Sequence, residues 1–165
     1  PAPDAMVLDC GCGGGANIKT LLKLCPNGKV QGIDYSAVSV EKARKVNARA
    51  IAAGRCTVQQ ASVAELPFEA EQFDVVTAFE TVYFWPELAQ NFREVYRVLK
   101  PGGIFFICNE ANGETTKDDK WTQIIDGMAI YTATALKEYL EKAGFCQIQS
   151  YKNKKGWLCV TAQKR

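Results

Sequence analysis

The stretch that decides the fold is DCGCGGG, residues 9–15. It follows a short apolar run at residues 5–10, which is typical of a buried strand, and precedes residues 16–25, whose apolar side chains recur at helical spacing. Glycine tolerates positive φ and carries no Cβ, so a glycine-rich turn between a strand and a helix lets a ligand approach the backbone. Three interpretations are open: a phosphate-binding turn, a Cys-x-Cys metal site, or a loop shaped around another ligand.

The residues around these glycines separate the interpretations. A phosphate-binding P-loop needs Lys-Ser/Thr after its glycines, and this chain has none. The Cys-x-Cys pair has no second pair and no histidine to complete a four-ligand metal site. Gly11-x-Gly13-x-x-Ala16 matches a dinucleotide-binding variant, and Asp34 follows at a spacing suited to ribose hydroxyls. However, Asp9 would repel a pyrophosphate and suits a ligand with cationic groups.

Strand-like and helix-like segments alternate along the chain. The predicted strands are residues 5–10, 29–34, 56–61, 73–79 and 104–109, followed by a pair near 145–151 and 157–163. The predicted helices are 16–25, 36–53, 88–99 and 134–143, and a surface insertion at 111–130 holds one amphipathic piece. This order predicts an α/β fold with a mostly parallel sheet and an antiparallel C-terminal hairpin. Ligands then bind beyond the carboxyl ends of the strands, near 9–15, 34–35, 61–63, 79–85 and 109–112.

Length and composition limit the function classes. A chain of 165 residues fits one domain. A net charge of +2 gives no strong field for nucleic acid or an anionic membrane, and no apolar run reaches the length of a membrane span. Seven cysteines, mostly inside apolar runs, suit a reducing cytoplasm better than a disulfide framework. The absence of histidine removes the commonest general base and metal ligand, so we expect no metal site.

Several short motifs recur in a family-specific order. Asp9-x-Gly11-x-Gly13-x-Gly15 follows an apolar strand, and an acid ends the second strand in GID, residues 32–34. LPF at 66–68, FDVV at 73–76, VLKPGG at 98–103 and AGF at 143–145 come after them. With these motifs the chain resembles the class I S-adenosylmethionine-dependent methyltransferases, in particular the small-molecule branch similar to enzymes of ubiquinone and menaquinone biosynthesis. The resemblance implies a Rossmann-like three-layer sandwich with a seven-stranded, mostly parallel sheet.

The resemblance also implies a cofactor, S-adenosyl-L-methionine, with S-adenosyl-L-homocysteine as the product. The implied cofactor-binding residues are Asp9, Gly11, Cys12, Gly13, Asp34, Tyr35, Ser62, Val63 and Phe79. The glycine backbone would hold the methionine part, with Asp9 close by. Asp34 would bind both ribose hydroxyls and Tyr35 would pack on adenine. Helix capping by Asp34 and simple core packing of Tyr35 are the alternatives.

One position departs from the family pattern. Members commonly have Gly-Asp-Ala after the third strand, with the aspartate on the adenine amino group, whereas this chain has Ala61-Ser62-Val63. Ser62 still offers a hydroxyl and Val63 a backbone amide. We therefore expect cofactor affinity to depend on Asp34 and on stacking.

The segment FETVYFWPE, residues 79–87, is the best candidate for contact with the methyl acceptor. Without histidine, Glu80 and Tyr83 are the candidate catalytic bases. The candidate acceptor-binding residues are Tyr83, Phe84, Glu110 and Asn112. Nucleic-acid amino-methyltransferases carry Asn/Asp-Pro-Pro-Tyr here, and its absence favours a small-molecule acceptor over DNA or RNA.

The domain prediction is a single methyltransferase domain, residues 1–165, without the helix or two that usually precede the first strand in the family. We expect such a form to bind cofactor and turn over slowly, as a cytoplasmic monomer or homodimer. Two alternatives stay open: an oxidoreductase that binds a nicotinamide dinucleotide, and a non-catalytic S-adenosylmethionine-binding protein.

Overall fold

A single twisted sheet organises the chain. The computed structural model describes residues 1–114 and 116–165. The strands are β1 (Met6–Cys10), β2 (Lys29–Asp34), β3 (Cys56–Gln60), β4 (Phe73–Phe79), β5 (Leu99–Asn109), β6 (Cys146–Lys152) and β7 (Leu158–Gln163). They form one seven-stranded sheet in the order β3-β2-β1-β4-β5-β7-β6. Neighbouring strands pair in parallel along β3, β2, β1, β4 and β5, whereas β7 pairs antiparallel with both β5 and β6. The predicted fold class is therefore confirmed.

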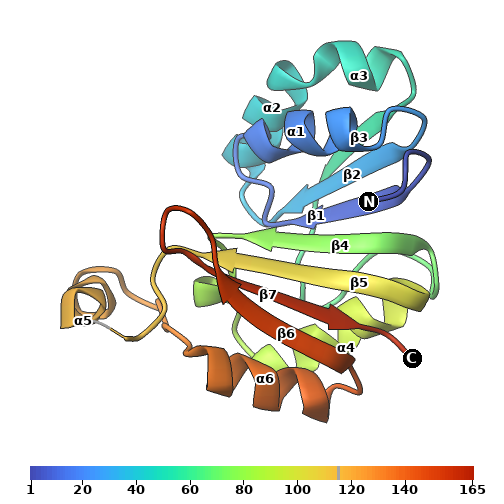
Figure 1. The fold of residues 1–165 in the computed structure, drawn as a ribbon. Coiled ribbons are helices and arrows are strands. Elements are labelled where there is room, and N and C mark those ends of the chain that lie inside the picture. Colours follow the sequence, from blue (N-terminus) through green and yellow to red (C-terminus); the bar gives the residue numbers. More distant parts are fainter. Residues whose placement is uncertain (115) are drawn as a thin grey trace.

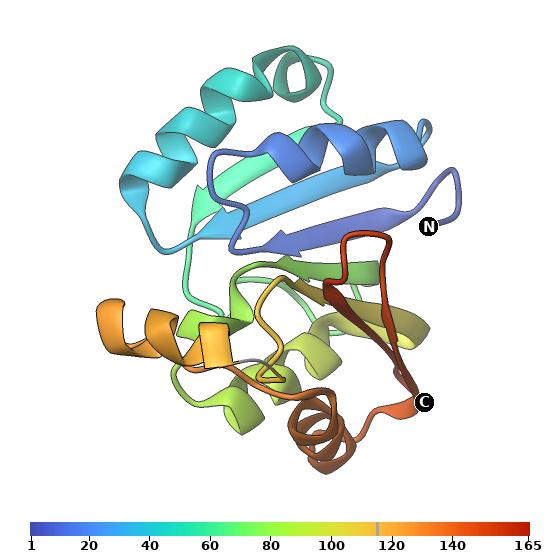
Figure 2. The same ribbon diagram turned by 60° about the vertical axis from the view of Figure 1, so that its left-hand side comes forward.

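Helices cover both faces of this sheet. Their bounds are α1 (Ala16–Leu24), α2 (Ala37–Val46), α3 (Ala48–Ala52), α4 (Leu88–Val98), α5 (Thr116–Ile124) and α6 (Ala133–Lys142), with a 3₁₀ turn, η1, at Val82–Phe84. Helices α1, α2 and α3 lie on one side of the sheet and α4 and α6 on the other, while α5 lies beyond the ends of the parallel strands (Figures 1 and 2). Of the helices that the structure describes, none is long and apolar enough to cross a membrane.

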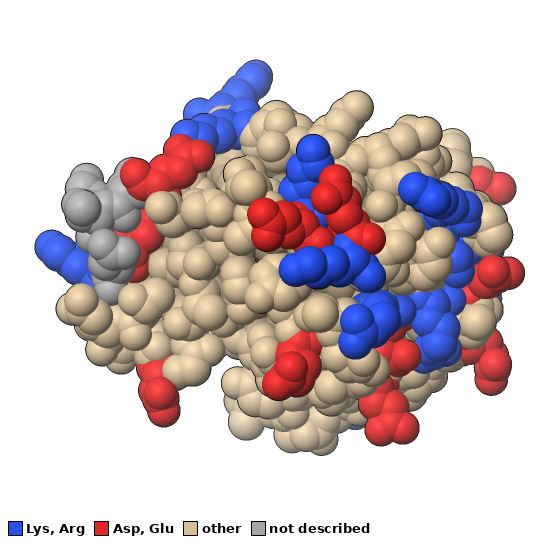
Figure 3. All heavy atoms as spheres, turned by 90° about the horizontal axis from the view of Figure 1, so that it is seen from below, with Lys and Arg blue, Asp and Glu red and all other residues tan. Residues whose placement is uncertain are grey.

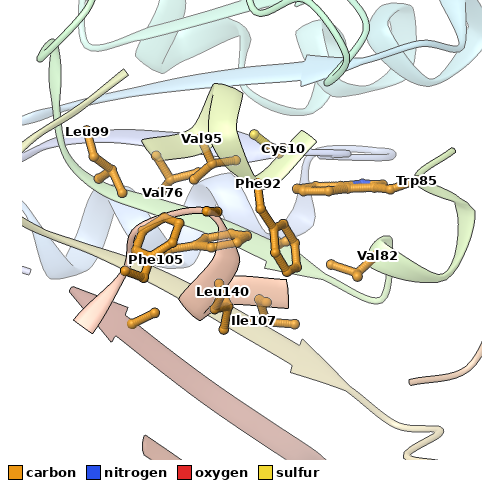
Figure 4. Packing of buried hydrophobic residues seen from close by; sticks show 14 of the residues in the cluster. Cys10, Val76, Val82, Trp85, Phe92, Val95, Leu99, Phe105, Ile107 and Leu140 are labelled. Atoms are coloured by element: carbon orange, nitrogen blue, oxygen red, sulfur yellow. The ribbon is translucent and has the colours of Figure 1, made fainter. Parts of the chain in front are cut away.

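Each face of the sheet has its own hydrophobic cluster. The smaller cluster joins α1 and α2 to residues such as Val7 and Val30, and the larger one joins α4 and α6 to the opposite face. In the larger cluster, Phe105 of β5 meets Phe92 of α4 edge to face, with ring centroids 5.4 Å apart, and stacks near Trp85 (Figure 4). Strands buried on both faces are typical of a parallel sheet, which explains their near-continuous apolar sequences.

The structure differs from the predicted elements at two places. The helix predicted for 36–53 is interrupted at Asn47, which separates α2 from α3. The Asn47 side chain donates hydrogen bonds to the carbonyls of Ala43 and Gly15, at 2.9 and 3.0 Å, and so ties the helix break to the glycine loop. The strand predicted at 104–109 begins at Leu99, since Leu99 pairs with Phe73 before a register shift.

The predicted insertion at 111–130 contains α5, and residue 115 within it lies outside the described residues. Trp121 and Ile124 of its amphipathic piece are 51% and 72% exposed. The segment after α5 is fastened to the body of the protein, because the Ala129 N–H donates to the Tyr83 carbonyl at 2.8 Å.

Candidate functional site

Three adjoining cavities lie at the carboxyl ends of the parallel strands, where the strand order reverses between β1 and β4. The glycine-loop cleft, about 490 Å³, is bounded by residues 11–14, Asp34 and Phe79 among others. The Asp34 cavity, about 450 Å³, lies between residues 33–35 and 61–63. The Glu80 cavity, about 260 Å³, lies between the segments after β4 and β5 and the C-terminal part of α5. Such a switch point is where ligands bind in open α/β sheets.

The glycine loop, residues 11–15, turns sharply at the end of β1. Gly11 and Gly13 have φ of 70° and 50°, in the left-handed region that favours glycine. The N–H groups of Gly11 and Cys12 both donate to the Ile33 carbonyl at 2.9 Å. A Cβ on Gly11 would lie 2.1 Å from Thr81 Oγ1, whereas a Cβ on Gly13 would meet nothing within 4 Å. Gly11 is therefore required by packing, while Gly13 leaves open space beside the cleft.

Asp34 fastens the loop to the second strand. Its side chain accepts hydrogen bonds from the Gly13 N–H and the Ser36 N–H, both at 2.9 Å. The residue is 8% exposed and lines both the cleft and the Asp34 cavity. The two predicted roles of Asp34 are compatible, because a carboxylate has about four lone-pair sites and can hold the backbone while accepting from a ligand. Ser36 itself caps α2, because its hydroxyl accepts from the Ser39 N–H at 3.3 Å.

Asp9 lies behind the loop and lines none of the three cavities. It is 1% exposed, and its Oδ1 accepts from the Thr77 hydroxyl at 2.8 Å. Among the described residues, its Oδ2 has no hydrogen-bond partner. Burial raises the pKa of Asp9 to about 7, with a smaller contribution from Asp34 and an opposing one from the Thr77 hydrogen bond. The structure thus places this acid under the loop rather than at the surface of the cleft.

Besides Gly11, Asp34 and Phe84, the walls of the Asp34 cavity include three more of the predicted residues. Tyr35 is 77% exposed, so its ring is not part of the core and is free to cover a ligand. Ser62 and Val63 also line the cavity, and the Ser62 hydroxyl accepts from the Ala64 N–H at 3.1 Å. Of the other residues that complete the cavity, Ala61, Thr81, Trp85 and Pro86 lie within segments that the sequence indicated as candidates for ligand contact, whereas Ile33, Asp126 and Gly127 were missed.

Two of the predicted cofactor residues, Phe79 and Cys12, border the cleft with side chains that offer a ligand no strong hydrogen-bonding group. Phe79 lines the cleft at the end of β4 and meets Phe106 edge to face, with centroids 5.7 Å apart. Cys12 lines the turn as predicted and is 6% exposed. Burial raises the pKa of the Cys12 thiol to about 12, so it stays protonated near neutral pH.

Glu80 lies where the glycine-loop cleft meets the Glu80 cavity, and it lines both. Its backbone φ is 55°, which is unusual for a residue with a side chain. Its Oε1 accepts from the Tyr83 hydroxyl at 3.2 Å and, at short range, from the Glu110 N–H. Desolvation raises the pKa of Glu80, and these two hydrogen bonds oppose the rise.

Tyr83 links the segments that follow β4 and β5. It is 3% exposed, and its hydroxyl accepts from the Ala111 N–H at 2.9 Å. Burial and the nearby Glu80 charge raise the pKa of Tyr83 well above its usual value. A phenol that ionises so reluctantly is a poor base, so the structure favours a positioning role for Tyr83 and leaves Glu80 as the better candidate base.

The remaining predicted acceptor residues differ in placement. Phe84 is 44% exposed and borders all three cavities. Glu110 is exposed on the rim of the Glu80 cavity. Asn112 lines none of the three cavities and instead shapes a turn, since its Oδ1 accepts from the Glu114 N–H at 3.0 Å. The structure therefore brings Glu80, Tyr83, Phe84 and Glu110 together and leaves Asn112 apart.

The site is acidic and lined by many uncharged groups. Among the described residues, the charged groups that line the three cavities are Asp34, Glu80, Glu110 and Asp126, with no Lys or Arg. Over residues 1–114 and 116–165, no group of three Cys, Asp or Glu side chains is placed to hold a metal ion. The arrangement therefore suits an organic ligand that carries positive charge and hydroxyl groups.

Comparisons with known proteins agree with this geometry. A family model described as a methyltransferase domain matches residues 8–107. The chain is 30% identical over 152 residues to a cycloartenol-C-24-methyltransferase of Arabidopsis thaliana, covering 87% of this chain and 45% of that protein. It is 35% identical over 111 residues to a demethylmenaquinone methyltransferase of Symbiobacterium thermophilum, covering 67% and 44% of the two chains. The chain thus spans less than half the length of either relative.

A solved structure shares the fold. The S-adenosylmethionine-dependent methyltransferase from Aquifex aeolicus superposes with a TM-score of 0.82 at 22% identity, over 98% of this chain and 82% of that one. The family match covers β1 to β5 and includes the glycine loop, Asp34 and Glu80. The chain therefore belongs to the class I S-adenosylmethionine-dependent methyltransferases, the family that its glycine loop and second-strand acid had indicated.

Proposed function

We propose that this chain binds S-adenosylmethionine across the glycine-loop cleft and the Asp34 cavity, and transfers its methyl group to a small molecule held in the Glu80 cavity. The observation that carries the proposal is the arrangement of the cavities. The cleft and the Asp34 cavity share Gly11, Asp34, Tyr35 and Thr81, and the cleft meets the Glu80 cavity at Glu80. One extended ligand can therefore occupy the first two cavities and present a reactive group to the third.

The residues present fit the cofactor. The open space beside Gly13 admits the methionine part against the backbone, with Cys12 in the turn and Phe79 below. Asp34 retains lone pairs for the ribose hydroxyls. Tyr35 would cover adenine, with the Ser62 hydroxyl and the Val63 amide near its edge. Asp9 lies under the loop and would attract the cationic methionine part in its ionised form, which burial disfavours and a nearby cation would favour.

S-adenosylmethionine supplies a methyl group made electrophilic by the sulfonium. The protein then has to align the acceptor, exclude water and, for an acidic acceptor, accept a proton. Proximity and orientation supply roughly 7–11 kcal/mol in favourable intramolecular cases. Phe84, Trp121 and Met128 form part of the apolar wall of the Glu80 cavity, against which an acceptor would pack. Glu80 is placed to take a proton, and Tyr83 holds its carboxylate in position.

A small-molecule acceptor is supported by the size of the Glu80 cavity and by the surface. The cavity, about 260 Å³, holds a compact organic molecule. On the face of the molecule that carries α6, acidic and basic side chains are interspersed (Figure 3), which is unlike the basic stripe of a nucleic-acid-binding surface. The two curated relatives act on lipid-like molecules by their names, a sterol precursor and a demethylmenaquinone.

The proposal extends to organisation and location. Residues 1–165 would form one methyltransferase domain that binds cofactor and turns over slowly by itself. Support for slow turnover comes from the open Glu80 cavity. All seven cysteines are free thiols, which fits a reducing cytoplasm. Gel filtration with light scattering would separate a monomer from a homodimer.

The experiment is transfer of an isotope-labelled methyl group from S-adenosylmethionine to a library of small acceptors. We expect slow labelling of one acceptor class, and loss of that labelling in Glu80→Gln. Cofactor binding without labelling of any acceptor would favour the non-catalytic alternative. Labelling at rates ordinary for enzymes would contradict the proposal that the chain alone turns over slowly.

A further inference from the structure

We propose that the methyl acceptor is a compact apolar molecule that carries a basic nitrogen, and that Glu80 and Glu110 bind this nitrogen in the Glu80 cavity. The inference rests on the proposed function, because it takes the Glu80 cavity as the acceptor site. It names the chemical class of the acceptor, which the family membership leaves open.

The walls of the cavity combine apolar groups with negative charge. The apolar and aromatic side chains are Tyr83, Phe84, Ala111, Trp121, Ile125 and Met128, and the polar wall consists of the carboxylates of Glu80 and Glu110. No Lys or Arg is among the lining residues, all of which belong to the part of the chain that the structure describes. Aromatic faces and carboxylates together are the surroundings that favour a cation.

The charge of the acceptor follows from the cost of the alternatives. Among the described residues, the charged groups that line the cavity are two carboxylates, so an anionic acceptor would be repelled by them. A neutral acceptor with a hydroxyl would give Glu80 a hydrogen-bond donor, but it would leave both carboxylates without a compensating positive charge. A cationic nitrogen would pair with these carboxylates and lie against the Phe84 and Trp121 rings. The cationic acceptor is therefore the one for which both the aromatic and the acidic walls of the cavity contribute to binding.

The backbone conformation of Glu80 supports the inference that its carboxylate is needed at this position. In the described residues, positive φ outside glycine occurs at Glu71, Glu80 and Gln147. Such a conformation costs about 1–2 kcal/mol for a residue with a Cβ, and glycine would relieve it. At Glu80 the strained residue is also the one whose carboxylate faces both the cleft and the acceptor cavity. A strained side chain at a ligand site is typical of a functional position.

The chemical step balances for such an acceptor. The nitrogen binds as an ammonium ion and releases one proton through Glu80 to solvent. The freed lone pair forms a bond to the methyl carbon, the carbon–sulfur bond breaks, and its electron pair stays on sulfur. The products are S-adenosylhomocysteine and a methylated amine, which regains a positive charge as the new bond forms.

The test compares three probes that share one indole ring and differ in charge. Tryptamine is cationic, tryptophol is neutral and indole-3-propionate is anionic. Each is titrated into the complex of the full chain with S-adenosylhomocysteine, by calorimetry. We expect tryptamine to bind about tenfold more tightly than tryptophol, a difference within the range of cation–π and ion-pair contributions, and indole-3-propionate to bind most weakly.

Two variants and a matched control locate the preference. Glu80→Gln and Glu110→Gln remove charge with little change of shape, and together they should abolish the preference for tryptamine. Glu71→Gln is the control, since Glu71 has a similar φ of 58° and lines none of the three cavities. It should keep the wild-type ranking of the probes. Urea unfolding of each variant confirms that it is folded.

Equal affinities for the three probes, tightest binding of indole-3-propionate, or no binding of tryptamine to the S-adenosylhomocysteine complex would overturn the inference. So would an unchanged preference in the double variant. If a variant does not fold, the ranking in the wild-type protein still decides. Failure of S-adenosylhomocysteine itself to bind would instead refute the proposed function.

Discussion

Asp34 both stabilises the glycine loop and belongs to the proposed cofactor site. Its carboxylate accepts from the Gly13 and Ser36 backbone N–H groups and faces two of the cavities. Replacing it with alanine would therefore disturb the glycine loop as well as any ligand contact. Asparagine is the milder substitution, since its amide oxygen can keep one of the two backbone hydrogen bonds, which Asp34 accepts through separate oxygens.

We predict that Asp34→Asn weakens binding of S-adenosylhomocysteine by about 1.5–3 kcal/mol, the range for hydrogen bonds to a charged group. The reason is the loss of a charged acceptor for the ribose hydroxyls. Calorimetric titration measures the effect, and Glu71→Gln, remote from the site, should bind as the wild type does. Unchanged affinity in a folded Asp34→Asn protein would refute the ribose assignment.

Asp9 gives a prediction about pH. The pKa of Asp9 is raised from its ordinary value of 3.8 to about 7 in the folded protein, chiefly because of burial. The folded state therefore binds the extra proton between these values, and the wild type loses stability as pH rises from about 4 to about 7. Asp9→Asn removes this loss. The variant should gain stability relative to the wild type over that range, by an upper bound of about 4 kcal/mol, and remain level above it.

Urea unfolding of the ligand-free protein at several pH values measures this difference. Asp74→Asn is the control of opposite sign. Hydrogen bonds from Lys100 and the Met6 N–H outweigh desolvation and lower the pKa of Asp74, so its contribution is present at neutral pH and is lost on acidification. A pH-independent difference between Asp9→Asn and the wild type would show that Asp9 titrates normally.

At the scale of elements, the glycine loop depends on its contact with α2. Gly15 has a φ of 80°, and a Cβ on it would lie 2.5 Å from Asn47 Nδ2 and 2.9 Å from the Ala43 Cα. The loop, the end of α2 and the start of α3 therefore form one packed unit. This unit positions the N–H groups and the open space of the cleft.

We predict that Gly15→Ala lowers the free energy of unfolding more than Gly54→Ala does. Both glycines have positive φ, but a Cβ on Gly54 would meet nothing within 4 Å. Gly54→Ala should cost about 1–2 kcal/mol from backbone strain alone. Gly15→Ala should cost about 1–3 kcal/mol more, from forced packing. Equal losses in urea unfolding would mean that the contact with Asn47 and Ala43 contributes nothing.

The helices and strands themselves were largely predictable, since apolar periodicity and glycine or proline breaks set them locally. The break at Asn47 was not, because it depends on a side-chain hydrogen bond to Gly15, distant in sequence. The role of LPF, residues 66–68, was likewise hidden. The carbonyls of Leu66 and Phe68 accept from Arg97 of α4, at 3.0 and 2.8 Å, which fixes the segment before β4.

At the scale of the whole molecule, strand order creates the site. From β1 the sheet extends through β2 to β3 on one side and through β4 to β5, β7 and β6 on the other. Two separate hydrophobic clusters form on its opposite faces. The sequence predicted this edge of the sheet and most of the residues on it. It could not predict that Thr81 closes against Gly11 or that Asp126 and Gly127 border the Asp34 cavity, because those loops carry no periodic pattern. Tertiary packing also placed Asp9 under the loop and Asn112 in a turn.

The most direct test of the central claim is a pair of calorimetric titrations of the wild-type chain, one with S-adenosylhomocysteine and one with NADH. The account predicts saturable binding of S-adenosylhomocysteine at one site per chain and no measurable binding of NADH, because the acidic site suits a cationic amino-acid group and opposes a pyrophosphate. Binding of NADH without binding of S-adenosylhomocysteine would contradict the account and favour a nicotinamide-dependent oxidoreductase.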